Sequence, residues 1–352
     1  MLNLAEGIER CGHAVDLVLA QVEGPYLSQV SNAVRIVDLG EGKLRGRSRT
    51  LSRLPALVRY LRRERPDAMV SALSRANLVA VWARRLAGSS TRLVVNVQNN
   101  VSHNAPSAPT LLGRQAPRLA RYFYRWADAV VGVSAGVADD LVQNVGLPDR
   151  LVRVVYNPSI TPELRQKMRV PLDDPWFEPG EPPVVLAVGR LMKQKDFPTL
   201  LNAFSHLRRR RQARLLILGE GSERRKLESQ VAELGLEEDV RFPGFVENPY
   251  PYMASSSVFV LSSLWEGLPT VLTEALYAGP PIVSTDCPSG PREILKDGEF
   301  GLLVPMRDPL ALAEAMTTAL EGNAPRSTQE SWQPYTIEAV VEDYLRLFFA
   351  DE

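Results

Sequence analysis

The chain has 352 residues, of which 45% are hydrophobic and 23% charged, a composition typical of a soluble globular protein large enough for two domains. Only Cys11 and Cys287 are present, which excludes a disulfide scaffold and favours a reducing compartment, and no run of about 18 apolar residues predicts a membrane-spanning helix. The net charge is zero, but residues 1–170 hold 24 Lys and Arg against 13 Asp and Glu, whereas residues 171–352 hold 17 against 28, so the first half favours an anionic partner.

The first half alternates helical and strand patterns, as an α/β domain does. Helices are expected over residues 1–11, 51–63, 77–86, 111–126 and 134–144. Strands are expected over residues 14–20, 33–38, 68–72, 92–97, 128–133 and 151–155. The first of two domains is therefore expected over residues 1–158.

Polar residues follow the expected strand over residues 92–97, and open α/β sheets bind ligands at such strand ends. Gln98 and His103 are the candidate cleft residues there. Gln98 cannot titrate, so His103 is the nearby group capable of acid–base chemistry. The alternative is that His103 is a bystander in a polar loop.

The expected helix over residues 111–126 carries four arginines at spacings of four, three and four, which places them on one face: Arg114, Arg118, Arg121 and Arg125. Like charges repel, so this face favours an anionic partner on the acceptor side. The alternative is a solvated basic face screened by salt, in a chain whose charge asymmetry reflects chance and an Arg-rich composition.

Residues 159–182 are rich in Pro, Asp and Glu and are expected to be a linker. The same alternation then resumes over residues 183–335, with strands expected over residues 183–188, 214–218, 240–245, 257–261, 281–284 and 301–304. A closing helix over residues 337–349 is apolar on one side, within a C-terminal segment of residues 336–352.

Two strand–loop–helix junctions of the second half can approach an anionic ligand. Arg190 and Lys195 follow the strand pattern over residues 183–188, where two cations can reach a diphosphate. Gly219 and Gly221 follow the next strand and would let backbone come close to a ligand.

The most informative stretch is residues 262–279, which follows the apolar pattern of residues 257–261. Pro269 suits the first turn of a helix and Gly279 its end, so a helix is expected over residues 269–278. Its unpaired N–H groups and positive dipole end would form an anion site directly after a strand.

Two carboxylates, Glu266 and Glu274, bracket this expected anion site with seven residues between them. Carboxylates accept hydrogen bonds from pairs of hydroxyls. A ligand that combines phosphate with sugar is therefore expected between them.

This Glu-x7-Glu, within Glu-Gly-Leu-Pro and Glu-Ala-x-x-Ala-Gly, resembles the signature of the retaining GT-B glycosyltransferases of the glycogen synthase and sucrose synthase type, the group 1 glycosyltransferases. The resemblance covers nearly the whole chain. It implies an α/β fold of two Rossmann-like domains facing each other across a cleft, with the C-terminal helix crossing back to the first domain.

The resemblance also implies the reaction: transfer of a sugar from a nucleoside diphosphate sugar, expected to be UDP-linked, to a glycan or lipid-linked acceptor with retention of configuration. Arg190, Lys195 and Glu266 would be the catalytic residues, without a metal or other cofactor. The implied donor-binding residues are Gly219, Gly221, Phe245, Gly267, Leu268, Thr270, Val271 and Glu274. Hexose and N-acetylhexosamine donors stay open.

A role in lipopolysaccharide or other polysaccharide biosynthesis is implied, with a cytoplasmic location on the inner face of the membrane, an anionic membrane surface as a further partner and no nucleic acid. A second hypothesis is a nucleotide-sugar-binding protein with impaired catalysis, because Gln98 stands where many relatives have a titratable His. A nicotinamide-dependent dehydrogenase is disfavoured, because no Gly-x-Gly-x-x-Gly follows a first strand.

Relatives also have a first strand and a glycine-rich loop before their first helix, whereas this sequence begins inside that helix. An interior gap in a parallel sheet would leave backbone groups unpaired, at about 1–3 kcal/mol for each buried group. The sequence therefore leads us to expect a strand and a glycine-rich loop before Met1, the alternative being a truncated product with a loose first domain.

Overall fold

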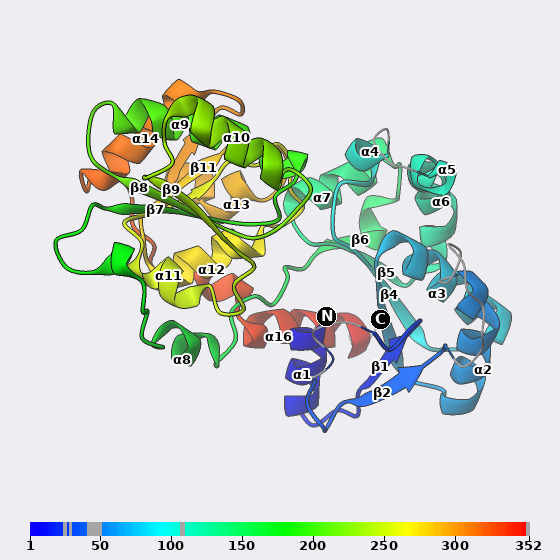
Figure 1. Ribbon diagram of the computed structural model, residues 1–352. Helices are drawn as coiled ribbons and strands as arrows, with labels where there is room; N and C mark the ends of the chain where they lie inside the picture. The colour runs from blue at the N-terminus through cyan, green and yellow to red at the C-terminus, as the bar shows by residue number, and fades with distance from the viewer. Residues whose placement is uncertain (24–26, 28–29, 41–50, 106–109, 350–352) are drawn as a thin grey trace. The chain divides into compact units, whose positions relative to one another are not determined.

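The computed structural model describes residues 1–23, 27, 30–40, 51–105 and 110–349. The chain divides into two compact units (Figure 1). The first unit consists of Met1–Pro158 and Ile337–Glu352, and the second consists of Ser159–Thr336. Each unit is built on parallel strands and has its own apolar core, so the expected α/β architecture with two Rossmann-like units is confirmed.

The first unit alternates strands and helices in the expected order. Its strands are β1 (Asp16–Leu19), β2 (Arg35–Asp38), β3 (Ala68–Ala72), β4 (Arg92–Val97), β5 (Ala129–Gly132) and β6 (Val152–Val154). Its helices are α1 (Leu2–Arg10), α2 (Leu54–Glu64), α3 (Ser74–Ala87), α4 (Val101–Asn104), α5 (Leu111–Arg114), α6 (Ala116–Phe123), α7 (Ala135–Asp139) and α16 (Ile337–Phe349).

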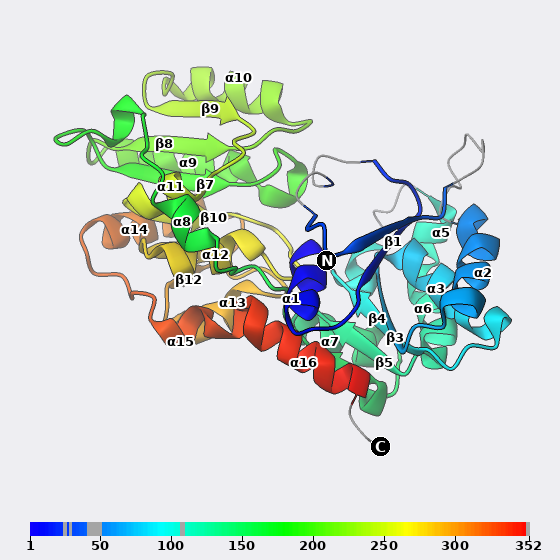
Figure 2. The same cartoon turned by 90° about the horizontal axis from the view of Figure 1, so that it is seen from below.

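The strands of the first unit form two separate parallel sheets. One has the order β3-β4-β5-β6, and the other pairs β1 with β2. Figure 2 shows α16 running along the first unit. Because the strands are parallel, the carboxyl ends of β4 and β5 lie at one edge of the four-stranded sheet.

The C-terminal helix α16 packs in the first unit, as expected. Its residues Ile337, Val340 and Tyr344 share a buried cluster with Leu4 of α1 and Val94 of β4. The helices α1 and α16 approach closely at Gly7, where any side chain would collide with those of Ile337 and Val341.

The arginine-bearing helix is not continuous over residues 111–126. Its α-helical part is divided between α5 and α6, with Gln115 between them, and it ends in a 3-10 turn at Tyr124–Trp126. Pro117 explains the break, because its ring would collide with the carbonyl four residues earlier, at Gly113 of α5.

The second unit contains a six-stranded parallel sheet in the order β12-β11-β10-β7-β8-β9, with helices on both of its faces (Figure 1). The strands are β7 (Val184–Val188), β8 (Arg214–Leu218), β9 (Val240–Gly244), β10 (Val258–Leu261), β11 (Ile282–Thr285) and β12 (Leu302–Val304). The helices are α8 (Leu164–Met168), α9 (Phe197–Arg208), α10 (Arg224–Leu234), α11 (Tyr250–Ser255), α12 (Thr270–Ala278), α13 (Pro291–Ile294), α14 (Pro309–Leu320) and α15 (Gln329–Trp332).

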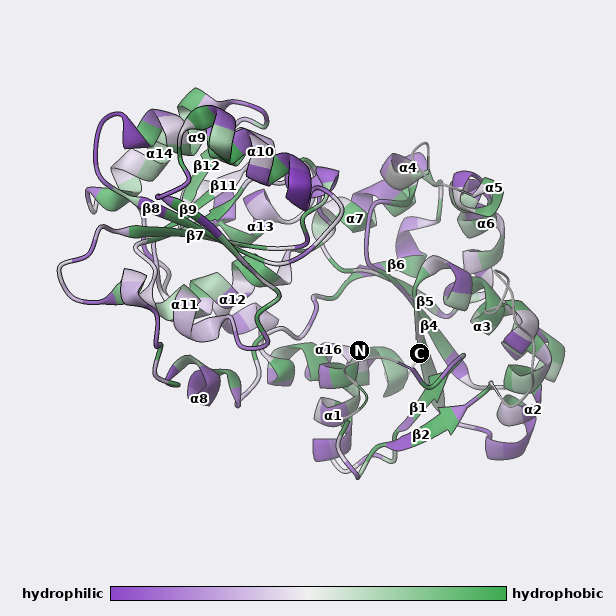
Figure 3. Ribbon diagram, viewed as in Figure 1, coloured by the Kyte–Doolittle hydropathy of each residue, from purple (hydrophilic) through white to green (hydrophobic). Residues whose placement is uncertain are grey.

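Helices cover both faces of this sheet. In Figure 1, α9, α10 and α14 lie on one face and α11 and α12 on the other. The central strands β7 and β10 are apolar, whereas α10 is largely hydrophilic (Figure 3). Continuous apolar strands are typical of parallel sheets buried on both faces.

Residues 159–182, expected as a linker, belong to the second unit. Ile160, Leu164 and Trp176 of this segment are buried, and the N–H groups of Ser159 and Ile160 donate to the carbonyl of Tyr335 at 3.1 Å each. The segment thus packs on the unit that it precedes. No helix in the part of the chain that the structure describes is long and apolar enough to cross a membrane.

The burial of Tyr344 gives a test of how α16 is held. Its hydroxyl accepts a hydrogen bond from Asn96 Nδ2, and both side chains are 1% exposed. We expect Tyr344→Phe to leave a buried amide donor without its acceptor and to lower the free energy of unfolding of the first unit by about 1–3 kcal/mol.

The matched control is Tyr122→Phe, the same change at a residue that is 68% exposed, which should leave stability unchanged. Urea unfolding followed by hydrogen exchange of β4 peptides measures both effects. Equal stability of the two variants would contradict the role given to the Tyr344 hydroxyl.

Candidate functional site

The candidate site lies at the carboxyl edge of the second sheet, where three neighbouring strands end. In the strand order β11-β10-β7, the segment after β7 carries Arg190 and Lys195, and the segment after β10 carries Glu266. Parallel strands direct their carboxyl ends to the same edge, so residues far apart in the sequence meet there.

Arg190 follows β7 on a short loop whose path depends on two glycines of the next junction. A side chain at Gly219 would collide with the carbonyl of Gly189, and one at Gly221 with the backbone of Leu191. Gly219 also has a φ of +142°, which favours glycine. In this structure the two glycines make room for the loop that carries Arg190, a role that the sequence pattern did not indicate.

The Arg190 side chain is exposed, and it makes no hydrogen bond or ion pair with any residue that the structure describes. It is therefore a cation available to a ligand at the strand edge.

Lys195 and Glu266 form the central ion pair of the site. Lys195 Nζ lies 2.6 Å from Glu266 Oε1, and the two side chains are only 15% and 8% exposed. A buried pair of this kind costs desolvation, and removing one partner leaves an uncompensated charge at a cost of about 3–5 kcal/mol. The pair joins the segment after β7 to the segment after β10.

Neighbouring polar side chains hold this ion pair in place. Ser263 Oγ donates to the same Glu266 oxygen at 2.6 Å, and Gln194 Nε2 donates to the carbonyl of Trp265 at 2.7 Å. Ser262 Oγ donates to the carbonyl of Lys195 at 2.6 Å. Both charged residues are thus positioned by hydrogen bonds before any ligand arrives.

The helix α12 begins at the same edge, at Thr270, which follows Pro269. Its first N–H groups, those of Thr270 and Val271, have no partner within the helix, and the positive end of the helix dipole lies beside them. The turn before it, which contains Gly267 and the buried Leu268, packs against Gly290, where a side chain would collide with the Pro269 ring.

Glu274 lies one turn into α12 and is half-buried. Burial raises its pKa to about 8, although a hydrogen bond from Tyr250 and the charge of Lys167 act in the opposite direction. A carboxyl group with this pKa is largely protonated at neutral pH and ionises readily when a hydrogen-bond donor or cation approaches. The surroundings of the two glutamates therefore differ, because Glu266 is already paired with Lys195.

Phe245 directly follows β9, and its side chain is 71% exposed. A large exposed ring at the carboxyl end of a strand can stack on a planar ligand. It lies on the same sheet edge as the other residues, but β9 is the outermost strand on that side.

Gln98 and His103 belong to the first unit, at the carboxyl end of β4. Gln98 exchanges hydrogen bonds with Asn157, in which Asn157 Nδ2 donates at 2.9 Å and Gln98 Nε2 donates at 3.3 Å, and it also donates to Asn96. Gln98 is thus engaged with the protein's own amides. His103 is exposed at the end of α4.

The four predicted arginines are all exposed despite the break between α5 and α6: Arg114, Arg118, Arg121 and Arg125. Arg118 contacts Gln115 at 3.4 Å and Arg125 donates to the carbonyl of Gly146 at 3.0 Å, so these contacts do not neutralise the charges of the two arginines. Exposed apolar side chains lie among them, with Leu111 at 79% and Tyr122 at 68% exposure. The surface is basic and partly apolar.

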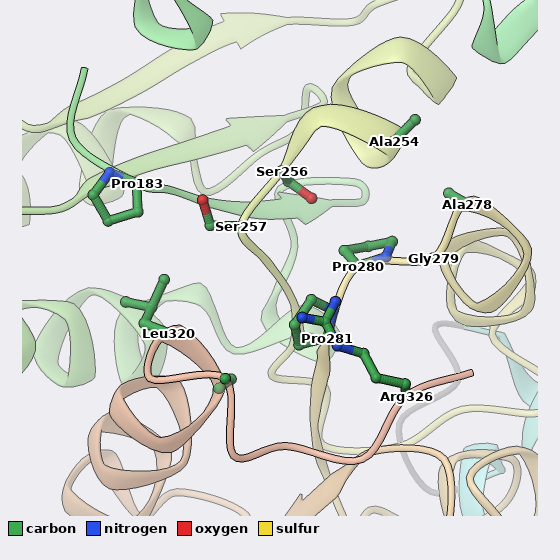
Figure 4. Close-up of a pocket in the computed structure, with 12 residues that line it drawn as sticks. Pro183, Ala254, Ser256, Ser257, Ala278, Gly279, Pro280, Pro281, Leu320 and Arg326 are labelled. Atoms are coloured by element: carbon green, nitrogen blue, oxygen red, sulfur yellow. The ribbon is translucent and has the colours of Figure 1, made fainter. Parts of the chain in front are cut away.

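A hollow of about 350 Å³ lies elsewhere in the second unit, between α14 and the amino ends of three strands (Figure 4). Pro183, Ser257 and Pro281, each just before a strand, line it. None of the predicted site residues does, so it is separate from the carboxyl edge described above.

Sequence reasoning missed the residues that hold the charged ones. Ser263 and Gln194 contact Glu266, and Tyr250 and Lys167 act on Glu274. Ser262 and Ser263 could have indicated these contacts, because small hydroxyl side chains directly after a buried strand often form hydrogen bonds to neighbouring loops.

Comparisons with known proteins match this architecture over both units. The family model "Glycosyl transferase 4-like domain" matches residues 1–158, and "Glycosyl transferases group 1" matches residues 171–338. Among solved structures, the apo form of the lipopolysaccharide outer core galactosyltransferase WaaB covers 99% of this chain and 94% of its own, with a TM-score of 0.74 at 20% identity. Anabaena HepE in complex with UDP-glucose covers 99% and 90%, with a TM-score of 0.71 at 21% identity.

Two curated relatives are more similar in sequence. A Campylobacter jejuni 4-alpha-N-acetylgalactosaminyltransferase that acts on a diphospho-undecaprenol-linked sugar is 34% identical over 74% of this chain and 68% of its own. The lipopolysaccharide core biosynthesis glycosyltransferase LpsE of Rhizobium meliloti is 31% identical over 84% and 79%. Together with the family models and the fold, these matches show that the chain belongs to the group 1 glycosyltransferases and is a glycosyltransferase of the GT-B fold.

Proposed function

We propose that the protein transfers a sugar from a uridine diphosphate sugar to a lipid-linked glycan acceptor, with retention of configuration. The observation that carries the donor part is the meeting, at one sheet edge, of the exposed Arg190, the Lys195–Glu266 pair and the start of α12. Similar structures containing UDP or UDP-glucose support the choice of donor, and the Campylobacter relative, which acts on a diphospho-undecaprenol-linked sugar, supports the choice of acceptor.

The diphosphate would be bound by Arg190, Lys195 and the N–H groups of Thr270 and Val271. These groups stabilise negative charge that accumulates on the departing UDP, which is where electrostatic catalysis is most effective. Two side-chain cations and a helix N-terminus take the place of a metal ion in this proposal. The loop that contains Gly219 and Gly221 supports the position of Arg190.

The other parts of the donor have candidate partners on the same edge. Glu274 would accept both ribose hydroxyls, and Phe245 would stack on the base. Glu266 would accept hydroxyls of the transferred sugar beside the turn that contains Gly267 and Leu268. Its Oε1 is occupied by Lys195 and Ser263, so Glu266 suits binding of the sugar better than nucleophilic attack.

Retention would then follow from departure of UDP on the face that the acceptor attacks, without a covalent enzyme intermediate. The acceptor hydroxyl would lose its proton as the bond between the anomeric carbon and the diphosphate oxygen breaks, and the leaving phosphate would receive it. The sugar transferred is a hexose or an N-acetylhexosamine, the classes to which the relatives' names refer.

The basic surface of α5 and α6 would hold the protein at an anionic membrane, where a lipid-linked acceptor is embedded. Exposed arginines interleaved with Leu111 and Tyr122 are suited to such a surface, because cations attract anionic headgroups and apolar side chains enter the interface. The proposed location is therefore the cytoplasmic face of the membrane, as a peripheral protein.

The first prediction concerns the diphosphate. Arg190→Ala removes charge-assisted hydrogen bonds of about 1.5–3 kcal/mol, so the affinity for UDP should fall about tenfold or more by calorimetry. Lys193→Ala is the matched control, because Lys193 is an exposed cation only three residues away with no partner in the described chain. UDP affinity that is the same in both variants and the wild type would falsify the assignment of Arg190.

The second prediction concerns the ribose and pH. Hydroxyl donors favour the ionised form of Glu274, whose pKa without ligand is about 8, so binding of UDP should release a proton near neutral pH. Affinity for UDP should therefore rise between about pH 6.5 and about pH 8.5.

Two comparisons isolate this effect from the titration of UDP itself. Glu274→Gln should remove the extra rise in affinity with pH, and it should weaken UDP more than 2′-deoxy-UDP. A pH dependence that is unchanged in Glu274→Gln would assign the proton release to another group.

The third prediction concerns the membrane. Each arginine near an anionic surface contributes about 1 kcal/mol, so Arg118→Gln with Arg121→Gln should weaken binding to phosphatidylglycerol liposomes by more than tenfold at low salt. UDP affinity should not change. The control is Arg209→Gln with Arg210→Gln, which removes the same charge from an exposed part of the second unit. Equal liposome binding by the two double variants would contradict the proposal.

A further inference from the structure

The first unit contains a polar hollow of about 620 Å³ that none of the residues assigned to the donor lines. Its walls are α4 with the residue before it and the end of α7, and its lining includes Asn100, His103, Asp139 and Gln143. A volume in the range of about 300–1,000 Å³ is typical of small-molecule sites, and this one is large enough for one or two sugar rings.

The wall formed by α7 is irregular. The helix continues beyond Asp139 as a π-helical turn, Asp140–Asn144, and such turns occur frequently at functional sites. Four residues of this region, 139, 140, 143 and 144, line the hollow.

Asp140 fixes the geometry of the hollow. It is only 4% exposed, and its carboxylate accepts hydrogen bonds from the N–H of Ser102 at 3.1 Å, from the Ser102 hydroxyl and from Asn144 Nδ2 at 3.0 Å. These bonds tie the start of α4 to the π turn. The two walls are therefore held together by a buried group whose acceptors are already used.

Asp139 and Gln143, by contrast, have side chains available for a ligand. Both are exposed, both line the hollow, and neither makes a side-chain hydrogen bond or ion pair within the described ranges of the chain. A carboxylate and an amide four residues apart present acceptors and donors to the same space, a combination that suits neighbouring hydroxyl groups.

The charge of the lining selects against phosphate. Two aspartates contribute to it, and none of the described lining residues is Lys or Arg. A diphosphate would meet repulsion from these carboxylates, whereas a neutral polyhydroxyl ligand would not. The lining therefore favours a sugar over the phosphate of a lipid carrier.

The position of the hollow agrees with this assignment. It lies beyond the carboxyl ends of β4 and β5, the edge at which open α/β sheets bind ligands. The helix α4 also packs against α6, which carries Arg118 and Arg121. A lipid-linked sugar could place its sugar in the hollow while its anionic part stays near the basic surface of α6.

We propose that this hollow is the binding site for the acceptor's terminal sugar, with Asp139 and Gln143 as specificity-determining residues and Asp140 as a positioning residue. The proposal rests on the proposed transferase function, but its test separates the two. Loss of Asp139 and Gln143 should affect acceptor binding and leave donor binding intact.

The test uses saturation-transfer NMR on the full chain with UDP present, with methyl glycosides of galactose, glucose and N-acetylgalactosamine as probes. At least one glycoside should bind the wild type. The double variant Asp139→Asn/Gln143→Ala should bind it about tenfold more weakly, because two hydrogen-bonding groups are lost. Asp67→Asn, at an exposed carboxylate elsewhere in the same unit, is the matched control and should bind as the wild type does.

Calorimetry with UDP accompanies each measurement and reports both on folding and on the donor site. The proposal is overturned if a wild type that binds UDP binds no glycoside, or if the double variant binds the glycoside as tightly as Asp67→Asn does. Displacement of the glycoside by pyrophosphate at saturating UDP would likewise overturn it. A wild type that does not bind UDP would instead contradict the donor function. Glycoside binding that depends on Asp139 and Gln143 would even then support the hollow as a sugar site.

Discussion

The ion pair between Lys195 and Glu266 is the interaction on which the candidate site of the second unit depends. It connects two segments that follow neighbouring strands, and it is shielded from water, so each charge needs the other. Ser263 and Gln194 fix the glutamate, and Ser262 fixes the backbone of the lysine. An incoming diphosphate would compete with Glu266 for Lys195, and the sugar hydroxyls would then compensate the carboxylate. Donor binding as proposed would exchange one set of partners for another without leaving a buried charge alone.

Much of the fold could be predicted, because buried parallel strands are short continuous apolar runs. The expected strands over residues 183–188 and 257–261 coincide with β7 and β10 within one residue. The return of α16 to the first unit was also predicted, but from the family resemblance. The break at Gln115 could have been predicted from Pro117, but the regular spacing of the arginines outweighed it.

The contacts of the site were much less accessible to sequence reasoning. Lys195 and Glu266 are 71 residues apart, and Gln98 and Asn157 are 59 apart, so neither pair can be inferred from local spacing. Gly219 and Gly221 were expected from the sequence to let backbone approach a ligand, and the structure adds that they accommodate another loop of the protein. Burial raises the pKa of Glu274, and the extent of that burial is visible only in the packed structure.

The two ends of the second unit are hydrogen-bonded to each other, through Ser159, Ile160 and the carbonyl of Tyr335. This unit is one uninterrupted segment, and the first unit is completed by a single helix after it. A segment whose ends meet can be exchanged as a cassette with two junctions, since neither junction has to span a distance. Chimaeras that join this second unit to the first unit of a related transferase, at Pro158 and Ile337, thus need only two junctions.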